Sequence, residues 1–176
     1  MSNKGLVHIY CGDGKGKTTA AVGLAVRCAG GGGKVLFFQF MKGNNSGERV
    51  AINQIAGIEL VSGAEKMKFV WDMSDEEKQK LAKYYNLKLE ELEIKAYNGR
   101  YDMLVLDEIM SAISCGFVDL EKICTFIENK PEGLEIVMTG REPDERLIKT
   151  ADYVSEIKKI KHPFDKNISA RKFIEF

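Results

Sequence analysis

The chain has 176 residues, of which 44% are hydrophobic, and this suits one globular domain (residues 1–176) with an ordinary core. Its 26 basic and 26 acidic residues cancel, which argues against a nucleic-acid-binding protein. The N-terminus has no apolar stretch fit for a signal peptide, and no run approaches the length of a membrane span. The four cysteines show no metal-ligand spacing. We therefore expect a soluble cytoplasmic protein with reduced thiols and with no membrane or nucleic-acid partner.

The first predicted strand, residues 6–10, leads into the most informative segment of the chain. That segment reads Gly12-Asp13-Gly14-Lys15-Gly16-Lys17-Thr18-Thr19, and a predicted helix follows it. Strand, glycine-rich turn and helix form the context of a phosphate-binding loop, in which backbone N–H groups converge on phosphate oxygens. Lys17 would reach the terminal phosphates, and the Thr18 hydroxyl would ligate Mg²⁺. A lysine-rich surface turn is the alternative, but the combined pattern favours a nucleoside triphosphate site.

One glycine of this loop departs from the common pattern. The usual spacing places the first glycine at position 11, but Cys11 stands there and Gly12 comes one residue late. The loop is therefore a variant, and it need not hold ATP in the pose of an ordinary hydrolase.

Short apolar strands alternate with helical stretches along the rest of the chain. Further strands are predicted at residues 35–40, 58–61, 103–106, 135–139 and 153–157. Helices are predicted from a capping box at Ser74 and Glu77 toward Tyr97, and over 120–128 and 143–151, with a polar loop at 42–48. This alternation indicates an α/β fold with a mostly parallel sheet and helices on both faces, the architecture of phosphate-loop (RecA-like) NTPases.

Acidic residues follow one predicted strand at the edge where ligands of open parallel sheets bind. Asp107 and Glu108 come directly after the strand at 103–106, where a carboxylate can meet Mg²⁺ directly or through water. The alternative is a helix-capping aspartate with a solvated glutamate. Since a phosphate loop needs a metal partner, we favour the metal role. Arg141, after the next strand, is a weaker candidate for a phosphate contact.

Two aromatic residues form a second candidate site. Phe69 and Trp71 would share one side of an extended segment, because residues two apart point the same way. Core packing is the ordinary interpretation of such a pair. The flanking charges of Lys66, Lys68 and Asp72 instead suit a segment near solvent, where the pair could form a wall for a large flat ligand.

The chain has two histidines. His8 alternates into a buried strand and is predicted to be structural. His162 lies in a bend before the last segment, from which it could reach a pocket, although a simple turn residue is the alternative.

Together these pieces resemble the ATP:corrinoid adenosyltransferase family of the phosphate-loop type. The resemblance covers the chain from Gly5 to Phe176. Besides the phosphate loop, the matching motifs are Gln39-Phe40-Met41-Lys42-Gly43, Gly47-Glu48-Arg49, Phe69-Val70-Trp71, Leu104-Val105-Leu106-Asp107-Glu108, Thr139-Gly140-Arg141, Ala151-Asp152 and Lys161-His162-Pro163-Phe164-Asp165.

The resemblance implies transfer of the 5′-deoxyadenosyl group of ATP to the Co(I) centre of a corrinoid, in adenosylcobalamin biosynthesis or salvage. Co(I) attacks the 5′ carbon and intact triphosphate leaves, so no general base is required. The loop and Mg²⁺ would stabilise charge on the departing triphosphate. By position, the resemblance implies that Lys17 contacts the phosphate next to the ribose, that Thr18 and Glu108 hold the metal, and that Arg27 contacts the nucleoside.

The resemblance also implies a role for the aromatic pair. In the family such a pair displaces the lower axial ligand of Co(II) and leaves four-coordinate cobalt, which cellular flavins can reduce. Phe69 and Trp71, with His162, would then bind the corrinoid. Family members are homodimers, and a reducing flavoprotein would be a further partner.

Two other functions stay open from the residues alone. A nucleoside or small-molecule kinase on the same fold would need a base, for which Asp107 could serve, and a lid with arginines, for which Arg49 is the one candidate. A non-enzymatic corrinoid or nucleotide carrier would bind ATP without consuming it. The preferred corrinoid does not follow from the sequence.

Overall fold

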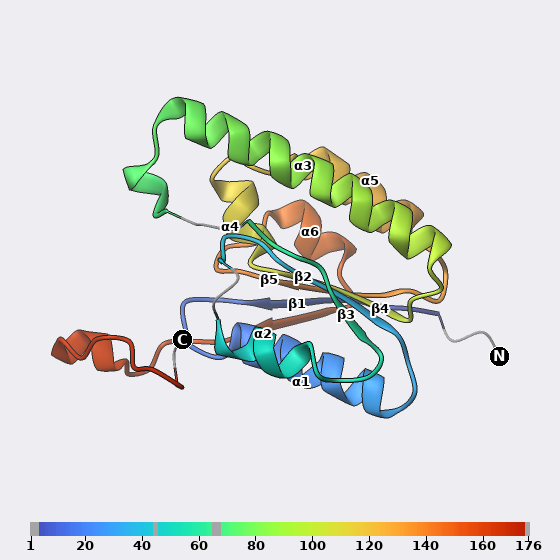
Figure 1. The fold of residues 1–176 in the computed structure, drawn as a ribbon, viewed down its shortest axis with the longest axis horizontal. Helices are drawn as coiled ribbons and strands as arrows, with labels where there is room; N and C mark the ends of the chain where they lie inside the picture. Colours follow the sequence, from blue (N-terminus) through green and yellow to red (C-terminus); the bar gives the residue numbers. More distant parts are fainter. Residues whose placement is uncertain (1–3, 44–45, 65–67, 175–176) are drawn as a thin grey trace.

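A six-stranded sheet forms the centre of the computed structural model, which describes residues 4–43, 46–64 and 68–174 (Figure 1). The strands are β1 (Val7–Cys11), β2 (Val35–Gln39), β3 (Ile58–Leu60), β4 (Met103–Asp107), β5 (Glu135–Thr139) and β6 (Tyr153–Glu156). Their order is β3-β2-β4-β5-β1-β6, and each neighbouring pair is parallel. The predicted parallel α/β sheet is thus confirmed.

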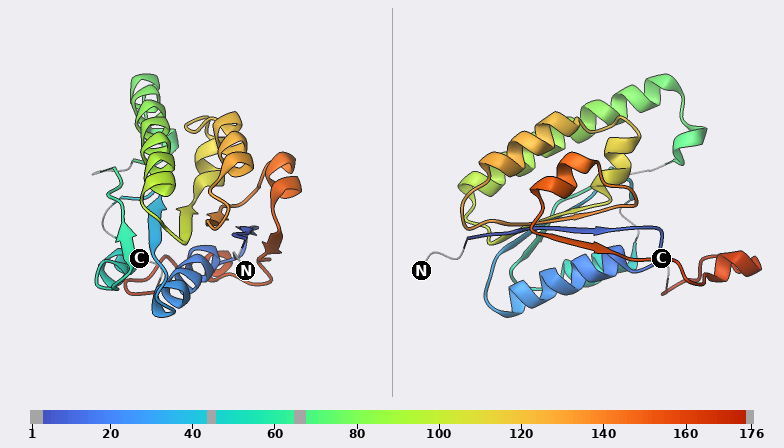
Figure 2. Two further views of the ribbon diagram at one scale, coloured as in Figure 1. Left: turned by 90° about the vertical axis from the view of Figure 1, so that its right-hand side faces the viewer. Right: turned by 180° about the vertical axis from the view of Figure 1, so that it is seen from behind.

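Helices cover both faces of the sheet, as predicted (Figures 1 and 2). One face carries α1 (Lys17–Gly30) and α2 (Gly47–Ile52). The other carries α3 (Asp75–Asn98), α4 (Ile109–Ser114), α5 (Leu120–Asn129) and α6 (Glu145–Thr150). Among the described residues, no helix combines the length and the apolar character needed to span a membrane.

Strands β2 and β4, which are neighbours within the sheet, are buried on both faces, which explains their largely apolar sequences. All five residues of β2 and all five of β4 are buried. Because successive side chains point to opposite faces, Phe37 packs in the core layer against α1, whereas Phe38 packs in the layer beneath α3. The sheet is therefore a rigid platform for groups at its edges.

The longest helix begins where its capping box predicts. The Ser74 side chain accepts from the Glu77 N–H, and the Glu77 carboxylate accepts from the Ser74 N–H. The helix ends at Asn98, followed by Gly99. Predicted helices at 120–128 and 143–151 are confirmed as α5 and the shorter α6.

Three local predictions were wrong or incomplete. The expected polar loop at 42–48 ends in helix α2, which starts at Gly47; its residues 44 and 45 lie outside the described part of the chain. The segment around the aromatic pair is not fully extended, because Val70–Asp72 forms the 3-10 turn η1. Helix α4 was not predicted. Lys66 and Phe176, cited for the aromatic pair and the resemblance, also fall outside the described residues.

The carboxyl ends of the strands meet at one edge, next to the N-terminus of α1. The chain leaves β6 there as residues 157–174, the C-terminal segment, which includes the 3-10 turn η2 (Pro163–Lys166) and projects from the body (Figure 2). Loops following the strands of an open parallel sheet are the usual place for a ligand.

Candidate active site

The phosphate loop connects β1 to α1 and needs two glycines in left-handed conformations. Gly12 has φ +102° and Gly16 has φ +124°, values that side chains rarely adopt. A Cβ on Gly12 would also lie 2.5 Å from the backbone oxygen of Ile157. The Lys17 ammonium donates to the carbonyl oxygens of Gly12 and Gly14 at 2.8 and 2.9 Å, so it lies across the loop.

The C-terminal segment supports this loop from one side. The Gly14 N–H donates to the Ile157 carbonyl at 2.7 Å, and the Ile157 N–H donates to Cys11 at 2.8 Å. The Asp13 carboxylate accepts from the Lys159 N–H at 3.0 Å, and this bond is the main reason that the pKa of Asp13 is lowered. Loop conformation is thereby coupled to the path of the chain after β6.

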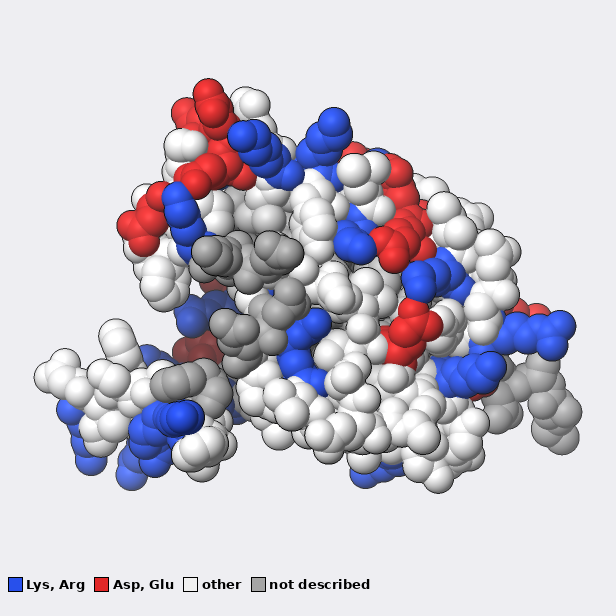
Figure 3. Space-filling model, viewed as in Figure 1, with Lys and Arg blue, Asp and Glu red and all other residues white. Residues whose placement is uncertain are grey.

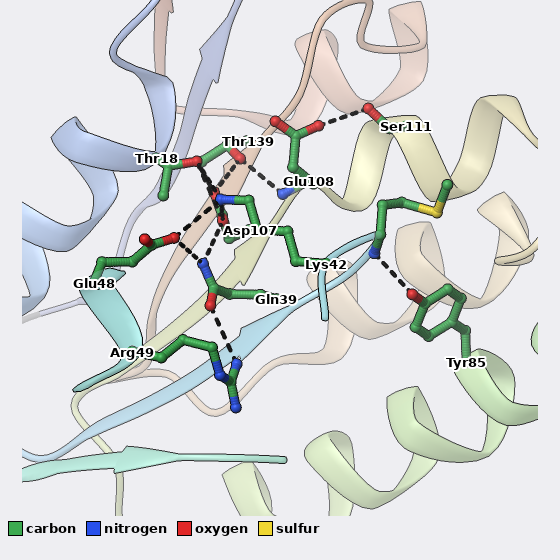
Figure 4. Close-up of polar contacts among 11 residues, drawn as sticks. Thr18, Gln39, Lys42, Glu48, Arg49, Tyr85, Asp107, Glu108, Ser111 and Thr139 are labelled. Atoms are coloured by element: carbon green, nitrogen blue, oxygen red, sulfur yellow. Dashed lines mark hydrogen bonds and ion pairs between the residues drawn. The ribbon is translucent and has the colours of Figure 1, made fainter. Parts of the chain in front are cut away.

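Asp107, the last residue of β4, is the centre of the polar cluster beside the loop (Figure 4). Its side chain is fully buried. One carboxylate oxygen accepts from the Thr18 hydroxyl at 2.9 Å and from the Thr139 hydroxyl at 2.7 Å. The other accepts from the Gln39 amide at 3.1 Å and from the Lys42 ammonium at 3.0 Å. These contacts offset the cost of burying a charge.

The strand order explains which residues surround Asp107. β4 is separated from β1 by β5, so the carboxylate reaches the phosphate loop past the end of β5, where Thr139 lies. On the other side β2 pairs with β4 in a register that places Gln39 opposite Asp107. Gln39, Asp107 and Thr139, which are distant in the chain, therefore meet because their strands end at one level.

Lys42 and Glu48 complete the cluster. The Lys42 ammonium lies 3.3 Å from the Glu48 carboxylate and donates to the Thr18 hydroxyl at 3.1 Å. Burial by itself would lower the pKa of Lys42, but Asp107 and Glu48 raise it above its ordinary value. Burial likewise opposes ionisation of Glu48, yet hydrogen bonds, the one from Gln39 foremost, keep its pKa below the usual value.

The hydrogen bonds of Arg49 and Gln39 that orient this cluster were not predicted from the sequence. The buried Arg49 guanidinium donates to the Gln39 side-chain oxygen at 3.1 Å and to the Val61 carbonyl at 3.3 Å. With its oxygen bound to Arg49, the Gln39 amide directs its NH₂ to Asp107 and Glu48. A glutamine closing an otherwise apolar buried strand was the available signal, since buried amides need partners.

Glu108 turns away from Asp107. Its backbone is left-handed, with φ 59°, and its N–H donates to the Thr139 hydroxyl at 2.8 Å. Its carboxylate accepts from the Ser111 hydroxyl at 2.7 Å, in the first turn of α4. Asp107 is thus the carboxylate that contacts Thr18, while Glu108 lies beside it on the cavity wall.

A cavity of about 460 Å³ joins these groups to the C-terminal segment. Figure 3 shows this side of the molecule hollowed between the C-terminal segment and the body. Loop residues 14–19 form one wall, with Lys42, Glu48 and Glu108 beside them. His162 lines the opposite part, and its Nδ1 accepts from the Phe164 N–H at 3.1 Å. His162 therefore lines the same cavity as Lys17, Thr18 and Glu108.

The aromatic pair lies outside the core. Phe69 and Trp71 are 66% and 78% exposed, and their rings stack with centroids 4.6 Å apart and planes 7° from parallel. Core packing is therefore excluded for both. The predicted shared face holds, although a 3-10 turn rather than an extended strand brings the rings together.

Three other candidates are not among the residues that line the cavity. Arg27 is in the last turn of α1, about 15 Å along the axis from Lys17 at the helical rise. The Arg141 backbone oxygen accepts from the Gly12 N–H at 2.8 Å, which anchors the loop. His8 pairs with Glu135 at the other end of the sheet, consistent with its predicted structural role.

Comparison with known proteins shows the family of this chain. The profile of the family described as ATP:corrinoid adenosyltransferase BtuR/CobO/CobP matches residues 3–176. The chain belongs to this family. The corrinoid adenosyltransferase of Escherichia coli (strain K12) is 31% identical over 177 residues, which cover all of this chain and 88% of that protein. The corrinoid adenosyltransferase of a Sinorhizobium species is 35% identical, over 98% of this chain and 81% of that protein.

Two solved structures share the fold of this adenosyltransferase. The ATPase 2 and 3 region of EssC from Geobacillus thermodenitrificans aligns with a TM-score of 0.52 at 12% identity. The match covers 97% of this chain, which spans about a third (35%) of that one. A structure of the cytoplasmic domain of EssC aligns with a TM-score of 0.55 at 14% identity. At such identity the likeness concerns the fold alone, and it supports the phosphate-loop NTPase architecture of this adenosyltransferase.

Family membership decides between the functions that the residues left open. The chain is a transferase that adenosylates corrinoids in an ATP-dependent reaction, and neither the kinase nor the carrier is favoured. A metal ion at this site would need more donors than the carboxylates of the described residues supply. Across the described part of the chain, no group of three or more His, Cys, Asp or Glu side chains could hold an ion by itself. Hydroxyl and phosphate oxygens would therefore be needed as well.

Proposed function

We propose that this adenosyltransferase places ATP in the phosphate-loop cavity and transfers its 5′-deoxyadenosyl group to a Co(I) corrinoid, with release of triphosphate. The observation that carries the proposal is the single cavity shared by the loop, Thr18, Glu108 and His162. A supernucleophilic metal centre has no proton to lose, so the reaction makes no demand for a general base in this cavity. The chain's task is to bind, orient and stabilise the leaving triphosphate.

The loop is suited to the leaving group. Its backbone N–H groups and the N-terminus of the 14-residue helix α1 favour anions. Lys17 would move from the loop carbonyls to the phosphate next to the ribose, where charge develops as the carbon–oxygen bond breaks. A nucleoside contact by Arg27 stays a prediction, since it lies at the far end of the helix.

The donor set fits Mg²⁺. The Thr18 hydroxyl and the Glu108 carboxylate line one cavity, and the buried Asp107 carboxylate contacts Thr18 behind it. All three are hard oxygen donors, which is the ligand type this ion prefers. We propose that Thr18 and Glu108 hold the ion, with Asp107 holding Thr18 and contributing directly or through water. When bound, Mg²⁺ would neutralise part of the negative charge on the departing triphosphate.

The corrinoid side of the site would use the exposed aromatic pair. Stacked Phe69 and Trp71 offer a flat apolar surface without a lone pair for cobalt, as needed to displace a lower axial ligand. His162 supports the opposite side of the site. Its Nδ1 accepts the Phe164 N–H, so Nε2 is the ring nitrogen through which it would contact a bound polar group.

We further propose, from the family resemblance, a homodimer that works in the cytoplasm with a reducing flavoprotein. The four free cysteines suit a reducing compartment. Sedimentation and a reductase-coupled assay would test the dimer and the partner separately.

The experiment that tests the reaction uses purified protein, Mg-ATP and chemically reduced cob(I)alamin under anaerobic conditions in the dark. We expect the alkylcobalamin spectrum to appear and to revert on illumination, with one triphosphate released per cobalt. ADP with a phosphoester would instead establish a kinase. Unchanged ATP, despite binding, would establish a carrier.

A further inference from the structure

The Lys42 ammonium occupies a cation position made of three oxygens. It lies 3.0 Å from the Asp107 carboxylate, 3.1 Å from the Thr18 hydroxyl and 3.3 Å from the Glu48 carboxylate (Figure 4). The Thr18 hydroxyl donates its single proton to Asp107, so it meets Lys42 with a lone pair. Hydroxyl and carboxylate lone pairs directed at one positive charge are also what a divalent cation binds.

The backbone delivers Lys42 to this position. Met41 adopts a left-handed conformation with φ 54°, which non-glycine residues seldom hold without support from the surrounding structure. Its N–H donates to the hydroxyl of Tyr85, a fully buried residue of α3, at 2.8 Å. Burial raises the pKa of Tyr85 to about 12, so this anchor stays neutral. The turn after β2 therefore directs Lys42 back over the end of its own strand.

We propose that Lys42 is an internal cation that competes with Mg²⁺ for the oxygens of Asp107 and Thr18, and that it yields them when the metal–triphosphate binds. Asp107 is fully buried and needs a positive partner before the substrate arrives. Lys42 supplies that partner. Mg²⁺ bonds oxygen at about 2.0–2.1 Å, so it and the ammonium cannot share these oxygens at once.

Once displaced, the Lys42 ammonium can contact the phosphates of the bound nucleotide, because it lines the same cavity. Lys42 lines the same cavity as Lys15, Lys17 and the rest of the loop, and its side chain is 27% exposed on a flexible stem. On binding, it would exchange carboxylate oxygens for phosphate oxygens. Metal without nucleotide would leave the ammonium with no anion, so metal and triphosphate should bind together. Such coupling is reciprocal by linkage.

The proposal rests on the metal site proposed above, and it is tested without any adenosyl transfer. Nucleotide-free protein is titrated with Mn²⁺ at pH 8, and free Mn²⁺ is read from its electron paramagnetic resonance signal. Lys42→Met removes the charge and keeps the stem. Lys42→Arg keeps the charge. Lys149→Met, at an exposed residue of α6, is the matched control for loss of one positive charge elsewhere.

We expect Lys42→Met to bind Mn²⁺ about tenfold more tightly than the natural protein, within the usual range of coupling between sites. Lys42→Arg and Lys149→Met should bind as the natural protein does. Adding Thr18→Val to Lys42→Met should abolish the gain, because the Thr18 oxygen that Lys42 and the metal would share is lost. If Lys42→Met does not fold by circular dichroism, Lys42→Gln carries the same test, since its amide can still donate to Asp107.

Equal or weaker Mn²⁺ binding by the neutral variants would overturn the proposal, and so would a gain that survives Thr18→Val. Failure of the function itself is seen elsewhere, as absence of the photolabile cobalt–carbon bond with the natural protein. The two failures are therefore distinguishable.

Discussion

The rings of Phe69 and Trp71 stack on each other while most of the surface of each side chain remains in solvent. An exposed stacked pair gains little for folding, because its apolar area is not removed from water. Each ring covers one face of the other, so the pair presents flat apolar outer faces to solvent. Such a face suits a flat macrocyclic substrate better than it suits the interior of the protein.

The pair gives the first prediction. Trp71→Ala should slow adenosylation that starts from Co(II) by about tenfold more than adenosylation that starts from prepared Co(I), a difference of about 1.4 kcal/mol in barrier. The reason is that, in the proposed mechanism, the apolar face would act before cobalt is reduced. Rates from both starting states, measured by the visible spectrum with a flavin reductant for Co(II), make the comparison.

Two controls accompany this prediction: the stability of the Trp71 variant, and a substitution at another exposed apolar residue. Because Trp71 is 78% exposed, Trp71→Ala should change the free energy of unfolding by about 0.5 kcal/mol or less. Leu87→Ala, at an exposed apolar residue of α3, should leave both rates unchanged. Equal losses from Co(II) and Co(I) would mean that Trp71 has only a structural role.

Lys17 gives a second prediction. Lys17→Ala should weaken ATP binding and lower the rate from Co(I) together, each by about a hundredfold or more, since a charged donor to the leaving group is lost. Calorimetry of ATP binding and the spectral assay measure the two effects. Lys149→Ala, far from the loop, is the control. Turnover retained in Lys17→Ala would remove the loop from the mechanism.

The fold was predictable where side-chain patterns are long or regular. The apolar run of β2 and the capping box at Ser74 gave correct elements, because burial on two faces and cap chemistry are local properties. Helices α2 and α4 have six residues each, too few for a helical period to show, and neither has the side-chain cap that precedes the equally short α6. Strand order depends on long-range pairing, which no local pattern encodes.

The motifs of the site were predictable from the sequence, but the contacts between their side chains were not. The loop and the acidic pair Asp107-Glu108 were found, yet which carboxylate contacts Thr18 depends on the left-handed turn at Glu108. The roles of Gln39 and Arg49 required the pairing of β2 with β4 and the position of α2. Neither is visible from residue spacing.

Arg49 gives a third prediction. Arg49→Met should lower the free energy of unfolding by about 1–3 kcal/mol, because the buried Gln39 oxygen and the Val61 carbonyl lose their donor. A freed Gln39 amide would no longer be held toward Asp107, so ATP affinity should fall as well. Urea denaturation and calorimetry measure these effects. Arg27→Met, at an exposed site, should leave stability within about 0.5 kcal/mol; a similarly small change for Arg49→Met would contradict the buried network.

Glu48 gives a pH-dependent prediction. Its pKa lies below the ordinary 4.5, so its ionised form favours the folded state. The stabilisation is present above that value and is lost as pH falls through the lower folded value. The difference in unfolding free energy between the natural protein and Glu48→Gln should therefore be constant near neutrality and shrink below about pH 4.5. Denaturation at several pH values tests this, with exposed Glu145→Gln as control. A difference that grows in acid would refute it.

Two glycines give the last prediction. A Cβ on Gly14 would lie 2.7 Å from the Ile157 oxygen, the same atom that accepts the Gly14 N–H, so Gly14→Ala must push the loop and the C-terminal segment apart. A Cβ on Gly23, exposed within α1, meets nothing within 4 Å. Gly14→Ala should cost about 1–3 kcal/mol and weaken ATP binding, whereas Gly23→Ala should stabilise by about 0.5–1 kcal/mol. Thermal unfolding and calorimetry on both variants decide this. If Gly14→Ala bound ATP normally, loop conformation would be independent of the chain after β6, and the support seen at Ile157 would have no part in nucleotide binding.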